Sequence, residues 1–393
     1  AEYRRFMNEL QRQGRLDRKL EFLPTDEVLL ERQTHGKSLT RPELAILISY
    51  AKAVLKEDLT QANIVDDEYL AKFIETAFPH KIAQLFPLAL RNHRLRCEIV
   101  ATQIANDMVN TMGISFAQRL MESTGASAGD VAKAYIIARD IYAMPEFLTA
   151  LDHAGTSIPA ELHLQLTNDM MRKIRRAARW FLRNRRSYLN PASEVELFAP
   201  GMLHINQHLP ELLVGDALQE WETSVQKLRA LSLPESLIRR VAHPADLYSG
   251  LSVVEAARIA NTDLQLLARV YFALGNYLSL PWFSNQISNL SVDNFWQAMA
   301  RETYLGDLES QLRSLSISLI RFIDDTVASD EVTVVLENVI DRWSQQHQLL
   351  IARWKSMVNE LQAVNGTDFA MIAVALRDLL DLAQASQHCN SLD

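Results

Sequence analysis

The sequence predicts an all-α protein. Nearly every long segment places its apolar residues at helical spacing, whereas the strict alternation of a β-strand is almost absent. The run 332–335 (VTVV) is the most strand-like, yet it continues into a long helical pattern. Clear helix starts precede several segments. We therefore expect about fifteen helices, packed as two helical subdomains.

The best-marked helix begins after Thr40. Thr40 can accept a hydrogen bond from a free backbone N–H group, and Glu43 can return one, which makes a capping box. Arg41 and Pro42 occupy the first turn, where proline is tolerated because no donor is needed. Beyond them, one apolar face is formed by Leu44, Leu47, Ile48, Ala51, Val54 and Leu55.

Other helix starts follow along the chain. Asp66 or Asp67 can cap a segment that runs to about residue 75, and a long helix starts near His93 and ends near residue 110. Ser127 with Asp130 and Ser252 with Glu255 are spaced as capping boxes. We expect a very long helix over about 159–186.

Proline and glycine mark the expected domain boundary. Asn190-Pro191 and 199–201 (APG) interrupt the helical pattern, so we expect subdomains over 1–190 and 191–393. In the second subdomain, leucines between 305 and 319 recur at alternating spacings of three and four. Two further helical segments follow, over about 330–361 and from 367, with connectors near 328–330 and 365–366. We expect an antiparallel three-helix bundle over about 293–389.

Bulk properties narrow the class of protein. The net charge is −8, which argues against binding of nucleic acid by the chain as a whole, and no apolar run reaches the length of a membrane span. Two cysteines give no disulfide framework, so we expect a cytoplasmic protein and a buried, inert Cys97. Because the chain begins with Ala1, we expect it to be part of a longer polypeptide.

Glycine spacing argues against a dinucleotide site. Only 12 of 393 residues are glycine, and no two of them are separated by a single residue, so G-x-G-x-x-G is absent. We expect no bound cofactor in this chain. His204 and His208 have zinc-like spacing but no evident third ligand, so we expect no metal site either. No catalytic residue can be assigned.

The strongest charge signal is a basic block in the long helix over 159–186. Eight Lys or Arg residues lie within fifteen positions, and a 3-4 spacing places an Arg stripe on one face, formed by Arg172, Arg175 or Arg176, Arg179, Arg183 and Arg186. The stripe could pair with carboxylates of the same protein, dock on an acidic partner or, least favoured, contact nucleic acid.

A second, mostly uncharged stripe lies on the helix that follows His93. Arg96, Gln103, Asn106 and Asn110 share one face. This face could hold the loops of another domain by hydrogen bonds, or it could simply be solvated.

Four stretches of this sequence resemble one known family. They cover 38–52 (SLTRPELAILISYAK), 93–107 (HRLRCEIVATQIAND), 126–139 (ASAGDVAKAYIIAR) and 175–183 (RRAARWFLR). These stretches look like the C-terminal helical region of the large bacterial NAD-dependent glutamate dehydrogenases, and the resemblance is specific over roughly residues 17–186.

The resemblance implies a parent enzyme that uses NAD to convert L-glutamate to 2-oxoglutarate and ammonia. It places the catalytic residues and the NAD site in a region that precedes this one, so none is carried over here. It also implies contact with the catalytic domain of the same polypeptide and assembly as a homo-oligomer. The residues expected at such contacts come from the helix start and from the two stripes. They are Thr40, Arg41, Glu43, Arg96, Gln103, Asn106, Arg172, Arg175, Arg176, Arg179, Arg183 and Arg186. The alternative is an independent helical scaffold that binds an acidic protein through the Arg stripe.

Overall fold

A computed structural model describes residues 2–155, 158–213, 215–231, 233–242, 250–323, 332–364 and 366–388. The described residues form 21 α-helices and short 3₁₀ helices and contain no β-strand, which confirms the all-α fold class. The expected number of about fifteen helices was too low. Connectors 328–330 and residue 365 lie outside the described residues, as does Cys389.

The chain divides into two compact units, which we describe separately. Unit 1 comprises residues 1–144 and 170–196, and unit 2 comprises residues 145–169 and 197–393. Two long helices, α11 (Ala160–Asn184) and α12 (Pro191–Leu212), contribute several residues to each unit, and α10 (Met144–Ala154) has its first residue in unit 1.

Unit 1 is built around α3 (Arg41–Gln61) and α7 (Arg96–Met112), which pack along each other and are joined by α9 (Ala128–Ile141). Its core includes Leu47, Ile104 and Tyr135. Its remaining elements are α1 (Glu2–Arg12), α2 (Asp26–Thr34), η1 (Ile64–Asp66), α4 (Glu68–Ala71), η2 (Lys72–Ala77), α5 (His80–Leu85), α6 (Pro87–Arg91), α8 (Phe116–Thr124) and η4 (Arg186–Tyr188). The helix expected to run from Asp67 to about residue 75 is therefore two shorter ones, α4 and η2.

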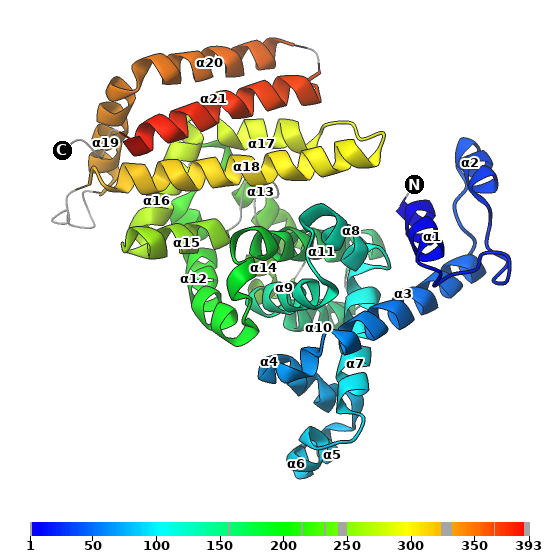
Figure 1. Ribbon diagram of the computed structural model, residues 1–393. Helices are drawn as coiled ribbons and strands as arrows, with labels where there is room; N and C mark the ends of the chain where they lie inside the picture. The colour runs from blue at the N-terminus through cyan, green and yellow to red at the C-terminus, as the bar shows by residue number, and fades with distance from the viewer. Residues whose placement is uncertain are drawn as a thin grey trace. The chain divides into compact units, whose positions relative to one another are not determined.

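Unit 2 is organised around α18 (Phe295–Ile320), which packs against α15 (Gly250–Ala260), α16 (Leu264–Tyr277), α17 (Leu280–Ser288) and α21 (Phe369–His388). Figure 1 shows α18 and α21 side by side along their length. The other helices are α10 (Met144–Ala154), α13 (Asp216–Ala230), α14 (Glu235–Val241), α19 (Val332–Gln346) and α20 (Gln348–Ala363).

Three local expectations in unit 2 were wrong. The helix expected over 330–361 is divided at His347 into α19 and α20. The expected interruption at 199–201 lies inside α12, which continues through Pro200. Ser252 does not cap a helix, because it lies buried within α15 and its hydroxyl donates to Glu309 Oε1 at 2.6 Å. The three-helix bundle stays a prediction, since α18 packs on α15, α16 and α17 as well as on α21.

Candidate functional site

The helix start at Thr40 forms as the sequence indicates. Thr40 Oγ1 accepts from the Glu43 amide at 3.4 Å, and Glu43 Oε2 accepts from the Thr40 amide at 2.7 Å. Glu43 Oε2 also accepts a hydrogen bond from Arg32 Nη1 at 2.8 Å. Burial alone would raise the pKa of Glu43, but the bonds from Arg32 and the Thr40 amide outweigh it and hold the pKa below its ordinary value. Thr40 and Arg41 remain exposed.

The polar face of α7 turns partly toward its own unit. Gln103 is half-buried, and its Oε1 accepts from the hydroxyl of Thr76 in η2 at 3.2 Å. Asn106 is also half-buried, whereas Arg96 is exposed and donates to the Arg91 carbonyl at 3.3 Å. Gln103 thus holds η2 against α7, and a contact of this face with another domain stays a prediction.

The most connected polar cluster joins α7, α9 and α4. Arg139 lies between two carboxylates, with Nε 3.1 Å from Asp107 and Nη1 2.6 Å from Asp140. The hydroxyl of Tyr135 donates to Asp107 at 2.9 Å, and that of Tyr69 donates to Asp140 at 2.8 Å. A chain of Tyr, Asp, Arg, Asp and Tyr therefore links three elements of unit 1.

Burial and neighbouring carboxylates affect the protonation of the two tyrosines in this cluster. Burial first, and then the adjacent Asp140, raises the pKa of Tyr69; burial and the charge of Asp107 raise the pKa of Tyr135. Both hydroxyls stay protonated at neutral pH and donate hydrogen bonds to Asp140 and Asp107. One signal for the cluster could be read from the sequence, since Tyr135 and Arg139 are four residues apart and share a helix face.

The Arg stripe is less exposed than its spacing indicates. Arg179 is buried, Arg175 and Arg176 are half-buried, and Arg172, Arg183 and Arg186 are exposed. The five from Arg172 to Arg183 each interact with other groups of the protein. Docking of an acidic partner on the stripe stays a prediction.

The end of the basic block holds unit 1 together. Arg186 donates to the carbonyls of Thr124 and Gly125 at 3.2 and 2.5 Å, just ahead of α9. Arg185, which was not among the predicted contacts, makes a two-point ion pair with the buried carboxylate of Glu194 at 2.8 and 3.2 Å. These bonds fix both ends of the segment between α11 and α12.

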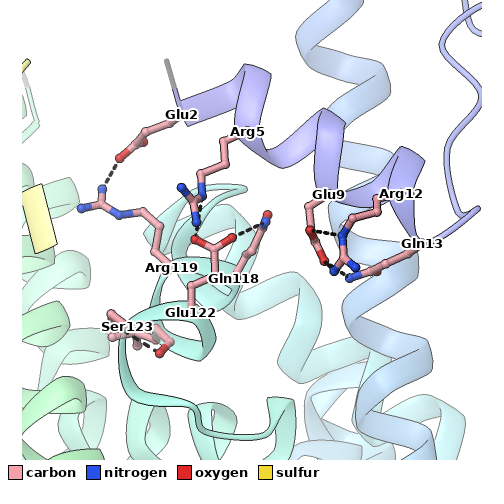
Figure 2. A network of polar contacts seen from close by, with 10 residues as sticks. Glu2, Arg5, Glu9, Arg12, Gln13, Gln118, Arg119, Glu122 and Ser123 are labelled. Carbon is pink, nitrogen blue, oxygen red and sulfur yellow. Dashed lines mark hydrogen bonds and ion pairs between the residues drawn. The ribbon is translucent and has the colours of Figure 1, made fainter. Parts of the chain in front are cut away.

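Helix α1 is fastened to α8 by polar contacts (Figure 2). Arg5 Nε lies 2.9 Å from Glu122, and Glu2 pairs with Arg119. Beneath these pairs, a pocket of about 60 Å³ lies between α1, α3, α7 and α8. Such a volume is far below the ~300 Å³ or more of a typical ligand site.

The cysteine and the histidine pair considered in the sequence lie in ordinary protein surroundings. Cys97 is half-buried rather than buried as expected. His204 Nε2 lies 2.9 Å from Gln265 and His208 Nδ1 lies 3.2 Å from Glu211. Across the described ranges, no group of three His, Cys, Asp or Glu side chains is placed to hold a metal ion. No helix among these residues is long and apolar enough to cross a membrane.

Comparison with known proteins agrees with the resemblance noted in the sequence. The family described as glutamate dehydrogenase, C-terminal, matches residues 36–381. The chain belongs to this family. All four resembling stretches supply helices of unit 1, and two of them, 93–107 and 126–139, meet at the Asp107–Tyr135 hydrogen bond.

Relatives in this family are much longer proteins. The NAD-specific glutamate dehydrogenase of Pseudomonas aeruginosa is 46% identical over 388 residues, which are 99% of this chain and 24% of that protein. The proteins of the same name from Halomonas elongata and Mycobacterium tuberculosis are 37% and 30% identical, over 98% and 94% of this chain. The chain thus spans about a quarter of the length of the curated relatives it matches.

Proposed function

We propose that this chain is the C-terminal helical region of an NAD-specific glutamate dehydrogenase and that it supports the catalytic domain or the assembly of subunits. One observation carries the proposal: the alignment covers 99% of this chain but only 24% of the Pseudomonas aeruginosa relative. We infer a supporting role because this chain corresponds to one part of a longer enzyme and the polar clusters of its described residues join its own helices.

The parent enzyme would oxidise L-glutamate. The overall reaction would convert L-glutamate, NAD and water to 2-oxoglutarate, ammonia and NADH, with NAD as the hydride acceptor. We place NAD and the reacting residues outside this chain. The partners we propose are the catalytic domain of the same polypeptide and further copies of the enzyme, in the cytoplasm, without a part for nucleic acid or membrane.

Polar contacts between the elements of unit 1 support this role. The Tyr69 to Tyr135 chain of hydrogen bonds joins three elements, and Arg185 and Arg186 tie the end of α11 to α12 and α9. Partly buried polar networks of this kind favour one arrangement of the packed helices, which a supporting region requires.

Two assays test the proposal. Residues 1–393 alone are expected to form no NADH from glutamate and NAD. A chimera in which this chain replaces the matching quarter of the Pseudomonas aeruginosa enzyme is expected to be active, whereas that enzyme without the quarter is expected to be inactive or unstable. Turnover by the isolated chain, or an inactive chimera beside an active truncated enzyme, would contradict the proposal.

A further inference from the structure

An exposed apolar surface lies at the beginning of α7. Five large apolar side chains of residues 80–96 are turned to solvent: Ile82 (43% exposed), Leu85 (62%), Phe86 (56%), Leu88 (70%) and Leu95 (52%). On the other side of the same segment, Ala83 and Leu90 are buried. Because that inner side anchors the segment, residues 80–96 form a fixed knob rather than a loose loop.

Packing of short helices holds the knob. Helices α5 and α6 contact each other, and η2 contacts both of them and α7 (Figure 1). His93 packs its ring on Phe78, with centroids 6.1 Å apart, and its Nδ1 accepts from the Leu95 amide at 3.1 Å. An apolar cluster of this size, held in place without cover, indicates a contact surface.

The knob is also basic. Lys81, Arg91, Arg94 and Arg96 are exposed, and no Asp or Glu occurs between Glu75 and Glu98. Within the described residues, none of the four side chains forms an ion pair. The arginines of the stripe, in contrast, interact within the protein. The knob therefore presents four exposed cationic side chains to a partner.

We propose that the knob docks on an acidic, partly apolar face of a folded domain that belongs to the same enzyme polypeptide but lies outside this chain. This inference rests on the proposed function. An apolar centre with arginines around it is the usual composition of a protein contact, and the positive charges call for carboxylates opposite them.

Other occupants fit less well. Two copies that met symmetrically through their knobs would bring two sets of four positive charges together, which opposes association. Helices that bind along a membrane surface are longer than α5 and α6, which have six and five residues.

Cysteine labelling tests the contact. Leu88→Cys is made in the isolated chain and in the chimera described above, and Leu349→Cys, at an 87% exposed position in α20, is the matched control. Peptide-resolved mass spectrometry after maleimide treatment distinguishes these thiols from Cys97 and Cys389. We expect Leu88→Cys to react at least about tenfold more slowly in the chimera, because the centre of a protein contact excludes solvent. Leu349→Cys should react equally in both proteins.

The outcomes separate this inference from the proposed function. Equally fast labelling of Leu88→Cys in an active chimera overturns the docking surface and leaves the proposed function intact. Protection in an inactive chimera supports docking and counts against the proposed function. Equal protection at both positions indicates general burial and overturns a specific contact at the knob.

A charge reversal identifies the partner class. Arg91→Glu with Arg94→Glu is expected to leave the unfolding midpoint of the isolated chain unchanged, because both side chains are exposed, and to restore fast labelling of Leu88→Cys in the chimera. Binding of the isolated chain to phosphatidylserine vesicles or to duplex DNA, abolished by this reversal, would assign the knob to another class of partner and overturn the proposal.

Discussion

The hydroxyl of Tyr135 is enclosed where α7 meets α9 and has Asp107 as its acceptor. Tyr135→Phe leaves that carboxylate without one of its donors, so we expect a loss of about 1–2 kcal/mol in the free energy of unfolding. Urea unfolding measures it. Tyr50→Phe removes an equivalent bond to Glu21, at a half-buried position, and should change stability by less than about 0.5 kcal/mol. Equal losses in the two variants would contradict a special role for the enclosed bond.

His347 makes stability depend on pH. It is buried beside Trp343, and burial lowers its pKa below the ordinary value of 6.5. As pH falls through that value, the unfolded chain takes up a proton that the folded chain does not. The contribution of neutral His347 to the free energy of unfolding is therefore complete above about pH 6.5. Below that pH it decreases by at most about 1.4 kcal/mol per pH unit.

Urea midpoints at about pH 7.5 and about pH 5.5 test this dependence. His347→Gln should lose less stability on acidification than the unchanged protein, because its side chain does not titrate. His35→Gln, at an exposed position, should lose as much as the unchanged protein. The same loss in all three proteins would show that His347 does not contribute.

Two glycines within helices should respond oppositely to alanine. A Cβ added to Gly201 in α12 would lie 2.7 Å from Val254 Cγ2, whereas one added to Gly275 in α16 meets nothing closer than Leu312 Cδ2 at 3.5 Å. Gly201→Ala should lose about 1–3 kcal/mol through overpacking, and Gly275→Ala should gain up to about 1 kcal/mol from helix propensity. Thermal unfolding compares them; a gain at both sites would refute the close approach at Gly201.

The capping box makes Thr40 important for the start of α3. Thr40→Ala removes the acceptor for the Glu43 amide and should lower stability by about 1 kcal/mol. Thr60→Ala, in the last turn of the same helix, removes only a bond to the Lys56 carbonyl and should change stability by less than about 0.5 kcal/mol. Chemical denaturation of both variants gives the comparison, and similar effects would contradict the role of the cap.

Helix starts could be predicted from sequence where a side chain bonds to nearby backbone. The boxes at Thr40 and Ser127 are of this kind, and both are confirmed. Features that depend on distant residues could not be predicted. Gly201 permits close approach of Val254 rather than ending a helix, and Ser252 bonds to Glu309, 57 residues away.

The candidate contacts show the same limit. Spacing correctly placed Arg172 to Arg183 on one helix, whereas Arg186 lies beyond its end, in η4. Only packing could reveal that Arg179 is buried. The knob was missed because its apolar residues match those of an ordinary buried segment. Exposure is a property of the folded chain, and the helical pattern alone does not say which apolar residues remain uncovered.

At the scale of the whole molecule, stability should not depend on a bound metal. The two histidines with zinc-like spacing already have Gln265 and Glu211 as neighbours, and the described residues hold no triad of suitable ligands. Addition of EDTA is expected to leave the thermal midpoint unchanged. A lower midpoint that recovers when zinc is restored would reveal a structural ion.

The tryptophans are distributed unevenly between the two units. Of its six tryptophans, Trp180 alone belongs to unit 1, where its buried indole lies edge-on to Phe181 at 5.2 Å. Phenylalanine at the other five positions would leave a single tryptophan, whose emission can be excited apart from that of the ten tyrosines. The fluorescence of Trp180 would then report the unfolding of unit 1, without a tryptophan signal from unit 2.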